Sequence, residues 1–157
     1  MQDMLLHEID EMLSNALIGR LSMADSDGRP YTIPLPFCWA DGAVYLRIPL
    51  SGRKGNVLAQ NDRVCFEVDQ FTDTLDEYAS VLAEGRLVAV TEVAEKQRVK
   101  QFNDDKYTRL RRGYRPGHGR GSDIEAIPMR KIVIESISGK RKDSPVVDAG
   151  AAAAVSA

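Results

Sequence analysis

Two Asp-Gly pairs separate short apolar runs in the first third of the chain. Asp27-Gly28 lies between 17–24 and 30–39, and Asp41-Gly42 leads from 30–39 into 43–48. An Asp-Gly pair between two short apolar runs is typical of a tight β-hairpin turn. Two such turns in succession predict an antiparallel meander of three strands.

The later part of the chain adds three more apolar runs with strand character. They span 63–69, 78–90 and 124–137. The second contains Gly85, where we expect a bulge or a bend, and the third is expected to break near Pro128. Six strands with short connections favour a small antiparallel barrel.

Three segments have helical character and are expected on the outside of the barrel. Apolar residues recur at a spacing near 3.6 over 2–15, a short helix fits 55–60, and a third fits 92–102, with a continuation toward Arg112 left open. The expected fold is therefore mainly β with flanking helices: a six-stranded antiparallel barrel that forms one domain over 1–142.

The composition is that of an ordinary globular protein. The chain has 157 residues, of which 43% are hydrophobic and 28% charged, and a net charge of -2 gives no general attraction to nucleic acid. No apolar run approaches the roughly 20 residues that cross a bilayer. The N-terminus MQDMLLHEIDEML is acidic where a signal peptide is basic, so we expect a cytoplasmic protein. The low-complexity tail 143–157 is expected to be disordered.

A polar turn between the strands at 43–48 and 63–69 has the residues of an anion site. Ser51, Arg53 and Lys54 lie there, directly before the short helix. Free backbone N–H groups at a helix start bind anions, and a hydroxyl, a planar guanidinium and an ammonium add further donors. Phosphate fits this combination best.

The strand Tyr31–Phe37 contains two prolines, Pro34 and Pro36. Residues two apart in a strand direct their backbone groups to the same side, so that side lacks two N–H donors but keeps its carbonyl acceptors. Two interpretations stay open. The strand forms a sheet edge, or its free acceptors face a ligand that carries N–H donors.

The segment 96–122 is strongly basic, with nine Lys or Arg residues against two acids, a local balance of +7. It forms a solvated helix face, covers a cleft that holds an anionic substrate, or contacts nucleic acid with Tyr107 and Tyr114 as stacking residues. The acidic remainder of the chain disfavours nucleic acid. His118 is either a loop residue or a cleft residue that acts as proton donor or haem ligand.

The order of five motifs resembles the pyridoxamine 5'-phosphate oxidase-like flavoproteins, nearest the branch with the nitroimidazole-resistance proteins. The motifs are GRPYTIPLPF, DGAVYLRI, SGRK, NDRVCFEV and SVLAEGRL, and the resemblance spans roughly 10–140. It implies a split β-barrel homodimer with FMN in two equivalent clefts at the subunit interface. It also implies an oxidoreductase that acts on a small organic substrate, with reduced nicotinamide as the expected donor.

The resemblance assigns cofactor contacts to residues of this chain. Arg53 and Lys54 match the basic pair that holds the FMN phosphate, and Ser51 lies in the same turn. Arg47 matches a strand position beside the phosphate, and Ser80 a polar contact to the flavin from the long strand. The strand along the isoalloxazine ring and the neighbours of Arg47 complete the set: Ile33, Pro34, Leu35, Pro36, Phe37, Leu46 and Ile48.

The chain also departs from the family pattern. Several nitroimidazole-resistance relatives have a histidine where Arg47 stands, which argues against nitroimidazole reduction. The arginine and histidine with which the oxidase itself grips its substrate phosphate have no aligned counterpart, which argues against pyridoxamine phosphate oxidation. Because some split-barrel relatives bind haem or a deazaflavin, a haem-binding protein and a non-catalytic flavin-binding module remain alternatives to the FMN oxidoreductase.

Overall fold

The structure is a computed structural model that describes residues 1–116 and 123–143. The expectations for His118 and for the tail from Ser144 onward lie outside these residues. No helix in the described part of the chain is long and apolar enough to cross a membrane.

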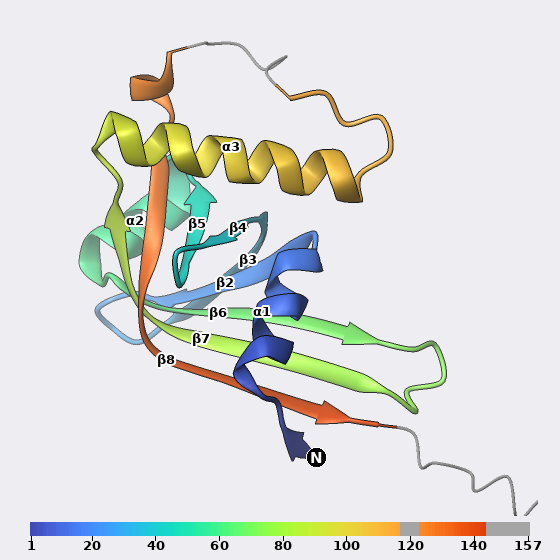
Figure 1. The fold of residues 1–157 in the computed structure, drawn as a ribbon. Helices are drawn as coiled ribbons and strands as arrows, with labels where there is room; N and C mark the ends of the chain where they lie inside the picture. Colours follow the sequence, from blue (N-terminus) through green and yellow to red (C-terminus); the bar gives the residue numbers. More distant parts are fainter. Residues whose placement is uncertain (117–122, 144–157) are drawn as a thin grey trace, which may run out of the picture.

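One curled antiparallel sheet forms the body of the molecule (Figure 1). The strand order is β3-β2-β6-β7-β8-β5-β4, with the short β1 paired to β8. Six strands have five residues or more, as expected, and β1 and β4 are short additions within the described residues. The strands are β1 Gln2–Asp3, β2 Ile18–Ala24, β3 Pro30–Pro36, β4 Cys38–Ala40, β5 Ala43–Arg47, β6 Arg63–Phe71, β7 Tyr78–Ala89 and β8 Met129–Lys142.

The two ends of the strand order are neighbours in the chain. β3 lies at one end and β4 at the other, and the single residue Phe37 joins them. The curled sheet therefore brings its two edges toward each other at Phe37 without pairing them, which is the split of a split barrel. We call this place the seam.

Alternation of side chains explains how the sheet encloses a core. Along β7, buried and more exposed residues alternate almost throughout, so that Val81 and Ala83 face inward and Leu82 faces outward. The main core combines such inward residues from several strands, and they include Leu21, Phe66, Val81 and Ile132.

Three helices cover the ends and faces of the sheet (Figure 1). α1 (Leu6–Asn15) buries Ile9, Met12 and Leu13 in the core. α2 (Gly52–Gln60) follows β5, and α3 (Val93–Leu110) crosses one end of the sheet beside β4. A 3-10 turn at Ile124–Ala126 leads into β8.

Three local predictions are confirmed. The turn at Asp27-Gly28 has Gly28 at φ 79°, and the hairpin between β4 and β5 has Asp41 and Gly42 at φ 51° and 70°. Two successive positive φ values are the geometry of the turn that an Asp-Gly pair favours. The ladder between β7 and β8 shifts register between Glu84 and Gly85, so the expected bulge is present.

Several element boundaries differ from the prediction. The helix expected over 2–15 begins only at Leu6, because Gln2 and Asp3 pair with Arg141 and Lys140 of β8. The strand expected over 30–39 divides at Phe37 into β3 and β4, since the chain crosses the seam there. The short helix expected over 55–60 begins at Gly52.

The third helix reaches Leu110 rather than Phe102. The last strand starts at Met129, after Pro128, and continues to Lys142. Residues 138–142, which the sequence analysis placed beyond the last strand, are therefore ordered by pairing with β7.

Candidate functional site

The turn between β5 and α2 has an open helix start. Ser51 is the N-cap residue, with φ -122° and ψ 154°, and its side chain makes no capping hydrogen bond. Gly52 follows at φ 65°, a left-handed conformation that glycine adopts without strain. The amide donors of the first helical turn are therefore not satisfied by the N-cap side chain.

The charge in this first turn opposes the helix dipole. Arg53 and Lys54 both lie there, and the turn contains no acidic residue. The N-terminus of a helix already carries partial positive charge, so two cations there repel it. Among the described residues, neither side chain has an ion-pair partner. An anion at this helix start would be attracted by the dipole and by both cations.

Close packing fixes where the helix begins. A Cβ atom on Gly55 would lie 2.9 Å from the carbonyl carbon and oxygen of Leu50, closer than side-chain carbons approach backbone. Glycine at this position therefore lets the first helical turn pack directly against the chain that leaves β5. This contact sets the position of Ser51 and Arg53.

Arg53 connects the turn to β3. Its guanidinium carbon lies 4.2 Å from the ring centroid of Tyr31, within the range of a cation–π contact. The turn between β5 and α2 and the two-proline strand, about 20 residues apart in sequence, are therefore neighbours in the fold. This brings together two of the segments that the sequence analysis singled out.

β3 is an edge strand, as one of the two interpretations predicted. It pairs with β2 alone within the described chain. The hydroxyls of Ser22 and Thr32, a directly opposed pair, lie 2.9 Å apart, which is typical of the close, non-hydrogen-bonded pairs of an antiparallel ladder. Pro34 and Pro36 share the orientation of Thr32, so their carbonyl groups point to the free edge. Whether these acceptors face a ligand stays a prediction.

Two buried side chains of α3 hold the residue that follows β3. The Phe37 N–H donates to the hydroxyl of Tyr107 at 3.0 Å, and the Phe37 carbonyl accepts from Lys106 Nζ at 3.0 Å. The Phe37 ring packs edge-on against Phe66 in the core, with centroids 5.0 Å apart. Ile33 and Leu35 are half-buried on the same inner face.

The end of β5 is fixed by β8. The side chains of Leu46 and Ile48 are buried in the core, whereas Arg47 is exposed. Ile48 N–H donates to the Pro128 carbonyl at 2.9 Å, and Arg130 Nη1 donates to the Ile48 carbonyl, also at 2.9 Å. Arg130 thus holds the residue that leads into the turn between β5 and α2.

Arg47 acts on the segment that follows α3. Burial raises the pKa of the Tyr114 hydroxyl, and Asp104, which accepts its hydrogen bond at 3.2 Å, raises that pKa further. The positive charges of Arg111 and Arg47 oppose this rise in pKa.

Ser80 lies apart from the other candidate residues. It is half-buried on β7, opposite Asp69 of β6 and Lys140 of β8. β2 and β6 separate it from β3, and α2 lies at the other end of the sheet from this hairpin (Figure 1). Within one chain, Ser80 therefore lies far from the turn between β5 and α2.

The basic segment 96–122 is only partly a solvated face. Lys96 and Lys106 are buried, and Lys96 Nζ donates to the carbonyls of Glu125 and Ile127, both at 2.8 Å. Burial lowers the pKa of Lys106 to about 8. Tyr107 is also buried, so it is no stacking residue for a nucleic acid.

Sequence reasoning did not find Lys106, Tyr107 and Arg130 as residues that hold the site. A lysine or arginine in a basic stretch is typical of solvated surface, and each of these residues contacts backbone more than 65 positions away. The only hint in the sequence was the high density of lysine and arginine after position 96, because the two acidic residues of that segment do not balance these charges.

Comparison with known proteins then assigns the family. The sequence profile of the family described as pyridoxamine 5'-phosphate oxidase matches residues 6–141. The chain belongs to the pyridoxamine 5'-phosphate oxidase family. A search of curated proteins finds no match.

Solved structures share the fold of this family member at low sequence identity. A putative 5-nitroimidazole antibiotic resistance protein from Bacteroides thetaiotaomicron is 18% identical with a TM-score of 0.69, over 89% of this chain and 86% of that one. An FAD-binding protein from Mesorhizobium loti is 22% identical with a TM-score of 0.65, over 91% and 98%. A heme binding protein from Mycobacterium smegmatis is 14% identical with a TM-score of 0.61, over 82% and 50%. The split barrel is thus common to proteins described as binding different cofactors.

Proposed function

We propose that the protein binds FMN and acts as a flavin-dependent oxidoreductase. The observation that carries this proposal is the start of α2, where Arg53 and Lys54 lie in an uncapped first turn without an acid. Such a helix start is energetically unfavourable alone and becomes favourable when a dianionic group binds there. Membership of the pyridoxamine 5'-phosphate oxidase family supports a flavin as the molecule that carries this group.

The residues present fit a phosphate monoester. Arg53 offers a planar pair of donors, Lys54 a point charge, and Ser51 a hydroxyl that caps nothing else in the helix. The terminal phosphate of FMN carries about two negative charges at neutral pH, as phosphate monoesters do. The bridging phosphates of FAD carry about one each, so two cations and a helix dipole at one point favour FMN.

The free edge of β3 suits the ring system of the same molecule. The contact between Arg53 and Tyr31 places that strand beside the turn. Its outward carbonyls at Pro34 and Pro36 are acceptors without competing N–H donors, and the imide N–H of a flavin needs such an acceptor. We infer that the ring lies along this edge while the phosphate binds at α2.

FMN supplies two-electron redox chemistry when bound, and the protein supplies binding and orientation. Arg47 adds positive charge at the end of β5, next to the proposed phosphate position. The substrate we expect is a small organic molecule, with reduced nicotinamide as the electron donor.

A homodimer would complete the site. Two strands, β2 and β6, lie between Ser80 and β3 in the same chain, so we infer that Ser80 reaches the proposed flavin from a second copy. The hairpin that carries it exposes Phe71, Leu75 and Tyr78, an apolar surface that a second copy would cover. Both observations support a flavin site shared between two subunits.

The test is cofactor uptake by the purified protein. FMN, FAD, riboflavin and hemin are each added, and free ligand is removed by gel filtration before the absorption spectrum is recorded. The proposal expects the flavin spectrum to stay with the protein most strongly for FMN. Retention of hemin with no retention of any flavin would contradict it and support the haem alternative.

A further inference from the structure

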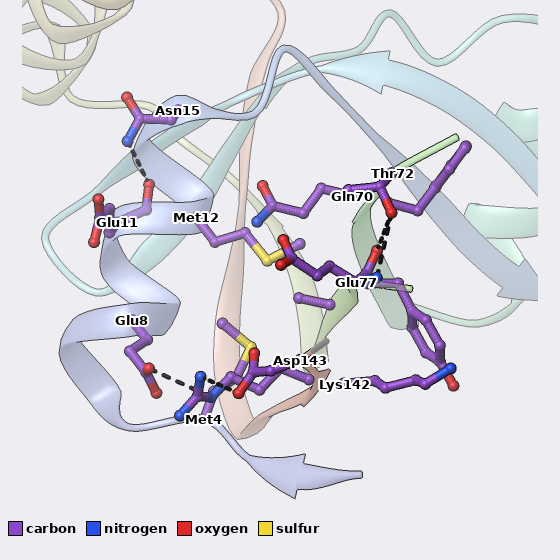
Figure 2. A pocket seen from close by; sticks show the side chains of 14 residues that line it. Met4, Glu8, Glu11, Met12, Asn15, Gln70, Thr72, Glu77, Lys142 and Asp143 are labelled. Atoms are coloured by element: carbon purple, nitrogen blue, oxygen red, sulfur yellow. Dashed lines mark hydrogen bonds and ion pairs between the residues drawn. The ribbon is translucent and has the colours of Figure 1, made fainter. Parts of the chain in front are cut away.

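A cavity of about 550 Å³ lies between α1 and the hairpin of β6 and β7 (Figure 2). The start of the chain, the N-terminal helix, the hairpin and the end of β8 each contribute to its wall. A volume of this size is in the range of sites for small organic molecules. None of the residues proposed to bind flavin lines it.

Most of the polar groups in the wall are already engaged. The charge of Arg141 is balanced by two carboxylates: its Nη1 donates to Asp143 Oδ2 at 2.7 Å, and its Nε lies 3.4 Å from Glu8 Oε1 in an ion pair, although this buried Nε makes no hydrogen bond within the described residues. The Thr72 hydroxyl contacts the backbone of Glu77 at 3.2 and 3.3 Å. With its arginine neutralised from both sides, the cavity offers little to an anion.

Two exposed polar side chains of the hairpin that point toward Met12 remain available. Within the described part of the chain, neither the Gln70 amide nor the Glu77 carboxylate has a hydrogen-bond or ion-pair partner. Both point toward the thioether of Met12 (Figure 2). Met12 and Ala79 are buried and Met4 is half-buried, so they give the cavity an apolar floor beside these two polar groups.

The wall of the cavity carries a net negative charge, the same sign as the Glu77 carboxylate. Four acidic side chains line the cavity against two basic ones. A carboxylate next to an amide oxygen attracts a group with several N–H donors and a positive charge. Thioethers are polarizable and pack well against aromatic rings.

We propose that this cavity binds a small amphipathic cation, a primary amine on an aromatic or alkyl body. The ammonium group donates to the Glu77 carboxylate and the Gln70 amide oxygen, and the apolar body lies on Met4 and Met12. Within one chain, the cavity lies at the hairpin end of the sheet, away from α2 (Figure 1), and its lining does not include Ser80.

The experiment titrates 2-phenylethylamine into the full-length protein and follows backbone amide signals by NMR. Two probes of the same shape, neutral 2-phenylethanol and anionic phenylacetate, separate charge from size. We expect the amine to shift the signals of Gln70, Glu77 and Ala79, and to bind about tenfold or more tightly than either control, as a charged hydrogen bond implies.

A variant and its matched control test the role of the carboxylate. Glu77→Gln should weaken the amine about tenfold or more and leave 2-phenylethanol unchanged. Glu92→Gln removes an exposed acid at the start of α3 and should change neither. Equal affinity for the three probes, or unmoved signals at Gln70 and Glu77, overturns the proposal. A second copy of the chain that fills the cavity would give the same unmoved signals, and that outcome overturns the proposal as well. Because the titration runs with and without FMN, its result is separate from that of the flavin test.

Discussion

Lys106 Nζ donates a hydrogen bond to the backbone carbonyl of Phe37 at 3.0 Å, from a buried position on α3. The ammonium also lies 3.8 Å from the centroid of the Phe37 ring. Phe37 is the residue at which the chain crosses the seam between the two edges of the barrel. A helix far along the sequence thus holds the point where the barrel is split.

The buried ammonium predicts a dependence of stability on pH. Burial lowers the pKa of Lys106 from 10.5 to about 8 in the folded protein. Between these values the unfolded chain binds the proton more tightly, so the free energy of unfolding contributed by Lys106 increases as pH rises from about 8 to about 10.5.

Lys106→Met removes this contribution. The difference in free energy of unfolding between the wild type and Lys106→Met should shift in favour of the wild type by up to about 3 kcal/mol across that window. Denaturant unfolding at a series of pH values measures it. Lys140→Met, at an exposed lysine on β8, serves as the control for replacing a surface lysine by methionine. Parallel curves for wild type and Lys106→Met would show that the amine is not desolvated.

Gly55→Ala should disturb the phosphate turn. The added methyl group would lie 2.9 Å from the Leu50 carbonyl, and backbone must move to admit it. We expect a loss of about 1–3 kcal/mol in the free energy of unfolding, the usual cost of overpacking, together with weaker FMN binding. Asn56→Ala, one residue along the same helix and exposed, should be neutral or slightly stabilising. Thermal unfolding that is unchanged in Gly55→Ala would exclude this packing argument.

Arg130 is predicted to act as a positioning residue for the phosphate turn. Arg130→Met removes the hydrogen bond to the Ile48 carbonyl, and FMN affinity should fall by about 10- to 100-fold, as loss of a charged hydrogen bond implies. Riboflavin, which lacks the phosphate, should lose much less. Arg130→Lys should restore part of the FMN affinity, and Arg63→Met, at an exposed arginine, should have no effect. Equal losses for FMN and riboflavin would assign Arg130 a general structural role.

The position of Ser80 predicts that two subunits share each flavin site. Ser80→Arg and the double variant Arg53→Ala/Lys54→Ala should each bind FMN poorly. When the two proteins are unfolded together and refolded, half of the randomly paired dimers are mixed, and each mixed dimer has one intact site, so about a quarter of all sites should bind FMN. If the mixture binds no more FMN than its parents, the two sets of residues belong to one chain or Ser80 is not at the site.

The local features of the fold could be predicted from the sequence. The Asp-Gly turns and the bulge at Gly85 depend on backbone conformations that glycine favours, so a few neighbouring residues are enough to indicate them. The proposed anion site also rests on a local pattern, because Ser51, Arg53 and Lys54 fall within four consecutive residues.

Long-range relationships were not predictable in the same way. The break at Phe37 lies inside one continuous apolar run, and the residue that binds the Phe37 N–H there, Tyr107, is 70 positions further along the chain. The burial of Lys96 and Lys106 depends on carbonyl partners on other elements. The pairing of Gln2 and Asp3 with β8 joins the two ends of the described chain, and no local pattern marks it.

The most direct test of the central claim compares FMN and riboflavin binding to the wild type and to Arg53→Ala/Lys54→Ala. Charged hydrogen bonds of this kind contribute about 1.5–3 kcal/mol each, so FMN affinity should fall by at least about 100-fold. Riboflavin affinity should change little, because riboflavin has no phosphate. Equal losses for the two ligands, or no loss of FMN affinity, would contradict a phosphate site at the start of α2.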